Sequence, residues 1–152
     1  HDIGNFMGRE NHQLSGALLA YNVLKELNFD ISFILKVMTA IASHDETNSE
    51  ITDKVSAVLI LADKSHVHKQ RVREKDIAKF DIHDKVNYAV QESDLIAYPT
   101  KQEIWLTLTV DTNISKVLDY FEIFLNRMLL CKKAASFLGY NFHLKINDSV
   151  LY

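Results

Sequence analysis

The chain begins with His1-Asp2-Ile3-Gly4, which places two residues of metal-ligating type next to each other. The expected fold is built around this pair. Isolated histidines follow at His12 and His44, and Asp63 stands at the end of an apolar run. Imidazole nitrogen combined with carboxylate oxygen suits iron, manganese, zinc or nickel, whereas sites made only of oxygen ligands suit calcium or magnesium. The spacings are too wide for a zinc finger, and the single cysteine, Cys131, lies far along the chain. A site made of these residues requires several helices to converge in space.

The opening stretch is predicted to end a helix at Gly4, and a second helix is predicted over residues 12–27 with Asn11 as its N-cap. Its predicted buried stripe, with steps of three and four, is Leu14, Ala17, Leu18, Tyr21 and Leu24. Gly16 and Ala17 are small, so this helix can approach the His-Asp pair closely. These residues predict two elements packed closely enough to share a metal.

A further helix is predicted over residues 31–44, with Asp30 as its N-cap. Its predicted inner face is Ile34, Val37, Met38 and Ile41. His44 lies three residues past Ile41 and continues the same face, which points its imidazole toward the interior.

The next helix is predicted to begin at Ser49 or Thr52 and to reach Asp63. Its predicted buried residues are Val55, Val58, Leu59 and Ala62. The carboxylate of Asp63 follows a nearly apolar run, residues 57–62, and burying it is costly unless a metal or another cation pairs with it. Asp63 therefore has the strongest physical case for a role as a ligand.

Near Ser93 the hydrophobic pattern changes from helical to alternating. Strands are predicted over residues 95–98, 104–110 and 142–146, with a long amphipathic helix over residues 114–138 that ends at Gly139. The expected fold is mainly α: a helical bundle over residues 1–92, followed over residues 93–152 by a small α+β module of antiparallel strands and one long helix.

The composition indicates an ordinary globular protein. Of the 152 residues 47% are hydrophobic and 24% charged, and the formal net charge of −3 gives no reason to expect a nucleic-acid partner. One cysteine cannot form an internal disulfide, so a reducing cytoplasm is the expected setting. No apolar run is long enough to cross a bilayer, and no membrane partner is expected.

Four segments carry a resemblance to a known family. They are HDIG (residues 1–4), NHQLSGALLAYNVL (residues 11–24), IASHDE (residues 41–46) and AVLILADKSHVHKQRVR (residues 57–73). Together they resemble the HD (HDIG-type) superfamily of metal-dependent phosphohydrolases, over roughly the first half of the chain. The resemblance implies an HD-type helical domain over residues 1–92. It also implies that the metal ligands are His1, Asp2, His12, His44 and Asp63, with Asp2 bridging two metals.

Two departures from the family pattern are visible. The family has one further histidine on the helix before the His-Asp pair, whereas nothing precedes His1 here, so the chain is expected to be a fragment that lacks the start of its domain. Asn5 stands where many HDIG relatives have a lysine that contacts substrate phosphate. The phosphate contacts are therefore expected to differ from those of the family.

The resemblance implies hydrolysis of a phosphorylated small molecule, in particular a nucleotide, by water activated at two divalent metals. Iron or manganese is expected first, with zinc, nickel, cobalt or magnesium as alternatives. Asp2 and Asp63 are the expected catalytic carboxylates, and Asp45, more than Glu46, is expected to orient water or a ligating histidine. Lys64 and Arg71 are the preferred contacts for substrate phosphate, and Arg9 is a further candidate.

Within the family, the patterns H..SGA, I.SH and LADK…R are most similar to hydrolases of symmetrical dinucleoside polyphosphates. The branch that acts on cyclic dinucleotides is disfavoured because no Gly-Tyr-Pro motif follows His44. Two alternatives stay open: a di-iron oxygenase of the same superfamily, and a catalytically degenerate domain used for binding or signalling. The apolar stripe of the predicted long helix is either core or an oligomer interface, and a homodimer is compatible with it.

Overall fold

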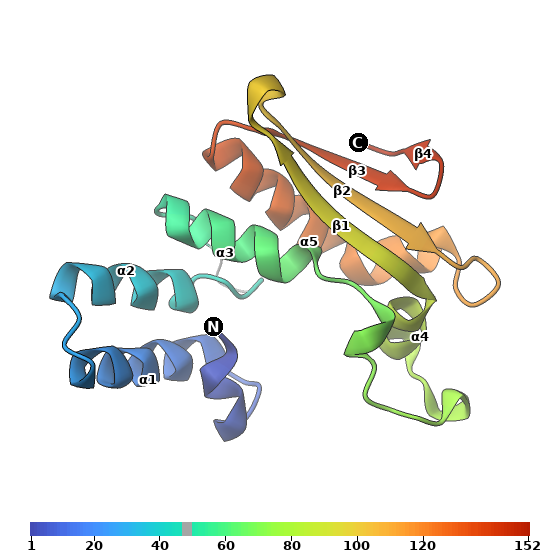
Figure 1. The fold of residues 1–152 in the computed structure, drawn as a ribbon. Helices are drawn as coiled ribbons and strands as arrows, with labels where there is room; N and C mark the ends of the chain where they lie inside the picture. Colours follow the sequence, from blue (N-terminus) through green and yellow to red (C-terminus); the bar gives the residue numbers. More distant parts are fainter. Residues whose placement is uncertain (47–49) are drawn as a thin grey trace. The chain divides into compact units, whose positions relative to one another are not determined.

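The computed structural model describes residues 1–46 and 50–152, which form two compact units, His1–Asp63 and Lys64–Tyr152 (Figure 1). The elements of the first unit are η1 (Asp2–Met7), α1 (His12–Glu26), α2 (Ile31–Ala42) and most of α3 (Lys54–Ser65). Those of the second unit are η2 (Lys69–Arg71), η3 (Ile77–Lys79), α4 (Ile82–Ala89), β1 (Val90–Tyr98), η4 (Pro99–Lys101), β2 (Glu103–Val110), α5 (Val117–Phe137), β3 (Asn141–Ile146) and β4 (Ser149–Val150). A mainly α fold with a small α+β module is confirmed.

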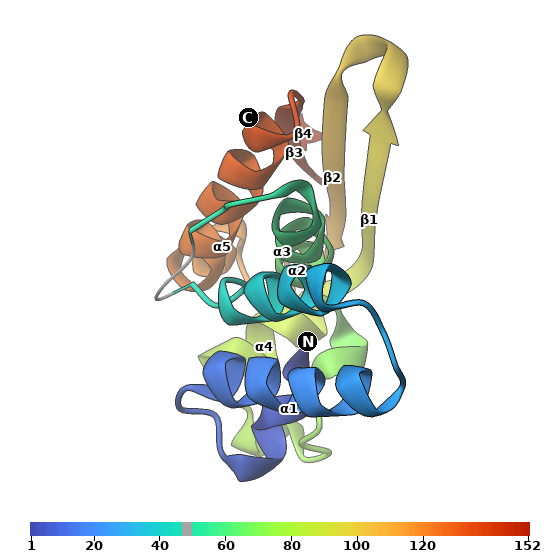
Figure 2. The ribbon, with the colours of Figure 1, turned by 90° about the vertical axis from the view of Figure 1, so that its left-hand side faces the viewer.

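In the first unit α1 and α2 lie side by side (Figures 1 and 2). Their shared core consists of Ala17, Ala20 and Ile41, with Val37, Met38 and Ala42 packed against it. Asp30 caps α2 as predicted, because its carboxylate accepts a hydrogen bond from the backbone N–H of Ser32 at 2.8 Å. Asn11 occupies the predicted N-cap position of α1, but in a left-handed conformation and without a side-chain capping bond.

The face that α1 buries differs from the predicted stripe. Ala17 is buried as predicted, but Leu14 and Leu18 are 51% and 63% exposed, and α1 also buries the small residues Gly16 and Ala20. Helices approach most closely where side chains are short, so the small face packs against η1 and α2. Hydrophobic periodicity therefore predicted the helix α1 correctly, but it did not predict which face of α1 is buried.

The buried face of α3 also differs from the prediction. It begins at Lys54, where Asp53 accepts a hydrogen bond from the backbone N–H of Ser56 at 2.8 Å. The predicted alternative start at Ser49 lies outside the described residues. Val55 and Val58 are about half exposed, whereas the buried residues are Ser56, Ala57, Ile60, Leu61, Lys64 and Ser65. The run 57–62 is apolar all round, so its pattern does not single out one face.

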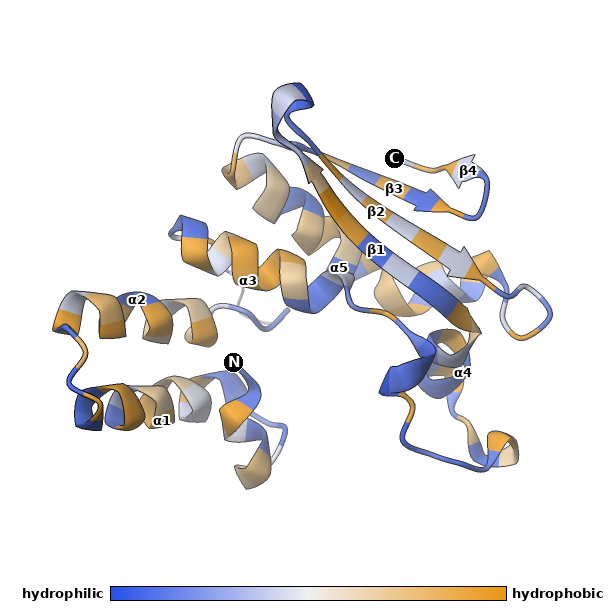
Figure 3. Ribbon diagram, in the orientation of Figure 1, coloured by the Kyte–Doolittle hydropathy of each residue, from blue (hydrophilic) through white to orange (hydrophobic). Residues whose placement is uncertain are grey.

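The second unit is a mixed four-stranded sheet in the order β1-β2-β3-β4, with α5 packed against β3 (Figures 1 and 2). β1 and β2 pair antiparallel, as predicted. Apolar and polar residues alternate along β3 (Figure 3), so Phe142, Leu144 and Ile146 are buried. The core of this unit also contains Leu106, Leu108, Tyr120, Phe124, Met128 and Cys131.

One detail of the predicted module is wrong, because β3 pairs with β2 in parallel. A helix of 21 residues connects the two strands, and a connection of this length returns the chain to the end at which β2 began. The short strand β4, which has no counterpart in the predicted elements, then pairs antiparallel with β3.

The compact units divide between Asp63 and Lys64, whereas the hydrophobic pattern changes near residue 93. The division into compact units does not test the domain boundary expected from the sequence between residues 92 and 93, which stays a prediction. Among the helices that the structure describes, none is long and apolar enough to cross a membrane.

Candidate metal centre

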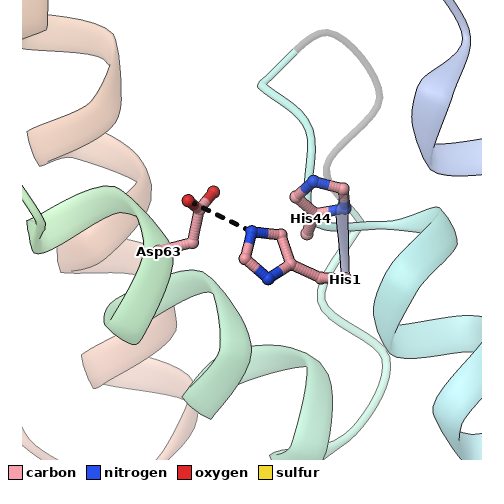
Figure 4. A group of neighbouring side chains, drawn as sticks. All are labelled: His1, His44 and Asp63. Atoms are coloured by element: carbon pink, nitrogen blue, oxygen red, sulfur yellow. Dashed lines mark ion pairs between the residues drawn. The ribbon is translucent and has the colours of Figure 1, made fainter. Parts of the chain in front are cut away.

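The five predicted ligands meet in the first unit, from four places in the chain. His1 and Asp2 lie at the start of η1, and His12 is the first residue of α1. His44 follows the end of α2 by two residues, and Asp63 lies on the last turn of α3. Figure 4 shows the imidazole of His1 between His44 and the carboxylate of Asp63. The convergence predicted from sequence is what these residues show.

Glycine at two positions lets η1 lie against α1. A Cβ atom at Gly4 would overlap the carbonyl oxygen of His12 and the hydroxyl of Ser15. At Gly16 a Cβ would lie 3.2 Å from the carbonyl oxygen of His1. Gly4 therefore does not end a helix, as predicted, but lies within η1 at its closest approach to α1. This approach brings Asp2 within reach of His12.

The imidazoles of His12 and His44 face each other, with 3.2 Å between their Nε2 atoms. On the opposite side of each ring, Nδ1 lies within hydrogen-bond distance of a backbone carbonyl, Arg9 O at 2.9 Å for His12 and Ile41 O at 2.5 Å for His44. A carbonyl only accepts, so each Nδ1 must carry the hydrogen and donate it. When both rings are neutral, the two Nε2 atoms present lone pairs to each other, and either a bound cation or a proton on one Nε2 offsets their repulsion.

The two carboxylates lie beside these imidazoles. Oδ1 of Asp2 is 3.4 Å from His12 Nε2 and 3.6 Å from His44 Nε2, and Oδ2 of Asp2 is 3.5 Å from His1 Nε2. His1 Nε2 is also 3.4 Å from Oδ1 of Asp63 (Figure 4). Asp2 thus places Oδ1 beside His12 and His44 and Oδ2 beside His1, which is the arrangement expected of a bridging carboxylate.

Two sets of donor atoms result, and they share His44. One set is His1, His44 and Asp63, the other is Asp2, His12 and His44, and the ligand atoms within each set lie within 4.8 Å of one another. For metal–ligand bonds of about 2.1 Å, neighbouring ligand atoms are separated by about 3.0–3.4 Å. The measured separations of 3.2–3.6 Å are close to that range. The donor chemistry and spacing therefore fit transition-metal cations.

Burial is graded across the cluster. The side chain of His44 is 1% exposed and that of Asp63 11%, whereas those of His1 and Asp2 are 29% and 52% exposed. The deep side holds His44 in a dry environment, where an unpaired charge or lone pair is costly. The shallow side is formed by His1 and Asp2.

The other predicted site residues are placed as follows. Asp45 is half-buried directly beside His44, and Glu46 is exposed. Arg9 is exposed in the loop before α1, and its backbone carbonyl, rather than its charge, contacts the cluster through His12. Lys64 is buried, and the guanidinium of Arg71 donates a hydrogen bond to the carbonyl of His66 at 3.1 Å within the second unit.

The contacts of the Arg9 and Ile41 carbonyls with the two imidazoles were not predicted from the sequence. Each belongs to the residue three positions before the histidine that it orients. Metal-ligating histidines usually donate their second ring N–H to a carbonyl or a carboxylate, so a carbonyl one turn upstream is the signal that could have identified them.

Comparison with known proteins returned no matching family model, no matching curated protein and no matching solved structure.

Proposed function

We propose that this chain is a metal-dependent phosphohydrolase that cleaves a phosphoester bond of a nucleotide or another small phosphorylated molecule, with water as the nucleophile. The observation that carries the proposal is the pair of Nε2 atoms of His12 and His44, 3.2 Å apart, beside the carboxylate of Asp2. Both rings are oriented by carbonyls on their far sides, so their lone pairs are directed at a common point. A bound cation accounts for that orientation better than a structural hydrogen bond does.

The proposed ligand groups are the two sets of donors that share His44. Iron or manganese suits them best, and zinc, nickel, cobalt or magnesium is the alternative. When bound, such cations lower the pKa of a water molecule and withdraw charge from a phosphoryl oxygen. The chain itself holds Asp2 and Asp63 against the imidazoles, which keeps the ligands in place before any substrate arrives.

The difference in side-chain exposure between His44 and Asp2 suggests the side from which a substrate would approach. Substrate phosphate is proposed to reach the cluster from the side of His1 and Asp2, because the imidazole of His44 closes the deep side. Arg9 is exposed in the same unit and is the proposed cation for a substrate phosphate. Asp45, beside His44, is proposed to orient the attacking water. Lys64 and Arg71 belong to the second unit, and their role in phosphate binding stays a prediction.

Elemental analysis of the purified full chain tests the metal, and a phosphatase screen over nucleotides and dinucleoside polyphosphates tests the reaction. His44→Ala and Asp63→Ala should each lose metal and activity. His83→Ala and Asp148→Ala remove the same residue types from exposed positions in the second unit and should retain both. Retained metal and activity in His44→Ala and Asp63→Ala would contradict the proposal.

The alternatives give different results in the same assays. A di-iron oxygenase would bind iron, consume oxygen and leave every phosphoester intact. A degenerate binding domain would hold no metal in the wild-type chain. Either result would overturn the proposed hydrolysis.

A further inference from the structure

The sheet of the second unit has an exposed edge at β1, over residues 94–98. The strand order β1-β2-β3-β4 makes β1 an outer strand, and Figure 2 shows it on the outer side of its hairpin with β2. We propose that a second copy of this chain pairs with this edge, strand β1 against strand β1, so that two sheets join in an antiparallel homodimer.

The hydrogen-bond pattern shows which backbone groups point outward. The N–H of Asn141 donates to Gln102 O and that of Asn147 to Leu108 O, so the even-numbered residues of β2 bond to β3. The odd-numbered residues of β2 therefore face β1, where they pair with even-numbered residues such as Asp94 and Ile96. It follows that Leu95 and Ala97 direct their N–H and C=O groups away from β2.

Only the beginning of this edge is covered within the second unit. His68 Nε2 lies 2.9 Å from the carbonyl of Gln91, and the hydroxyl of Ser93 donates to Ser65 O at 3.1 Å. Within the part of the chain that the structure describes, no further strand pairs with residues 94–98. Ile96 is 46% exposed and Tyr98 41% exposed. Exposed edge strands are usually protected by charged side chains, proline or a bulge; in β1 the bulge lies at Val90/Glu92, and Asp94 is the one charged residue among residues 94–98.

The sequence of the edge is complementary to itself in one antiparallel register. With the two-fold axis at Ile96, this residue lies opposite Ile96 of the second copy, and Leu95 exchanges backbone hydrogen bonds with Ala97 of the second copy. Asp94 then lies opposite Tyr98 of the second copy. Pairing ends at Pro99, which has no N–H to donate.

Charge favours the same register. The ammonium group of Lys101 lies 5.8 Å from the centre of the Tyr98 ring. In the dimer, the carboxylate of Asp94 meets the hydroxyl of Tyr98 and this ammonium from the second copy, once on each side of the axis. No like charges oppose each other, so the surface fits a second copy of the chain.

The oligomeric state in solution tests the pairing. Sedimentation velocity on the full chain, up to about 1 mM, should show a dimer that dissociates on dilution, because so short a pair of strands is a small interface. Ile96→Lys sets two ammonium groups against each other at the axis and should give a monomer with unchanged circular dichroism. Thr112→Lys, at an exposed position beyond the end of β2 and outside residues 94–98, should dimerise like the wild type. A wild-type chain that is monomeric throughout would overturn the proposal.

A disulfide tests the register independently of charge. Ile96 opposite its own copy would be a pair without hydrogen bonds, with Cα atoms about 4.5 Å apart, which suits a disulfide. Ile96→Cys should therefore give a covalent dimer on mild oxidation, whereas Thr112→Cys should remain largely monomeric. The natural Cys131 is buried and should not contribute. Equal crosslinking of both variants would contradict the register.

A charge exchange separates pairing with a second copy from pairing with an unrelated strand. Asp94→Lys should weaken the dimer by roughly fivefold or more. The double variant Asp94→Lys, Lys101→Asp should restore the wild-type dissociation constant, because both charges change sign on the same two-fold interface. Failure of the double variant to recover would contradict the proposed contact.

Discussion

The Nε2 atoms of His12 and His44 lie 3.2 Å apart, and on the far side of each ring Nδ1 lies within hydrogen-bond distance of a backbone carbonyl. This relationship connects the first residue of α1 to the residues after α2. A cation bound between the two rings and Asp2 would offset the repulsion between lone pairs on the two Nε2 atoms.

Binding of a divalent cation should therefore stabilise the first unit. Manganese at about a hundred times its dissociation constant adds about 2.7 kcal/mol, which raises the melting temperature by several degrees. Differential scanning fluorimetry with manganese and with a chelator measures this shift. His44→Ala should lose the shift and His83→Ala should keep it. An equal shift in both variants would indicate binding elsewhere.

Substitution of Gly4 should disrupt the site without removing a ligand. In Gly4→Ala the new Cβ overlaps backbone atoms of α1, so we expect a loss of about 1–3 kcal/mol in the free energy of unfolding, together with weaker metal binding. Gly16→Ala is the milder comparison, because its Cβ contacts of 3.2–3.4 Å require only small shifts of the neighbouring atoms and alanine favours the helix by about 1 kcal/mol. Urea unfolding should rank Gly4→Ala as the less stable variant. The reverse order would show that η1 does not lie against α1.

Tyr120 should make the second unit sensitive to alkaline pH. Its side chain is fully buried, its hydroxyl donates to Met128 Sδ at 3.1 Å, and burial raises the pKa of the phenol above its ordinary value of 10.0. The folded state therefore keeps a proton that the unfolded state releases, so this contribution to stability is present below pH 10 and falls by about 1.4 kcal/mol per pH unit above it. Tyr120→Phe should lack this component. Identical pH profiles for the two proteins would contradict it.

The contribution of Asp30 to stability should be lost at acidic pH, whereas that of Tyr120 is lost at alkaline pH. Hydrogen bonds from Ser32 at the start of α2 hold the pKa of this carboxyl below its ordinary value of 3.8. A lowered pKa in the folded state contributes stability above the unfolded pKa, and that contribution is lost as the pH falls through the folded value. Asp30→Ala should therefore melt below the wild type at neutral pH, and the difference should shrink in acid. Thermal denaturation monitored by circular dichroism at both pH values measures the change.

Local chemistry predicted many elements correctly. Asp30 and the apolar steps that follow it predicted α2, and the alternation of Ile104, Leu106 and Leu108 predicted β2. These signals depend on neighbours in the sequence, so they can be read without a fold. The parallel pairing of β3 with β2 was missed because it depends on where the long helix α5 returns the chain.

The sequence by itself determined which side chains were available for a metal centre and which segments form helices or strands. It determined this because ligand chemistry and hydrophobic periodicity are properties of residues and their near neighbours. Tertiary structure alone decided that α1 buries Gly16 and Ala20 rather than Leu14 and Leu18, since the buried face depends on what can approach it most closely. It also decided that His12 and His44 meet, because a distance between two helices is set by packing and not by spacing along the chain.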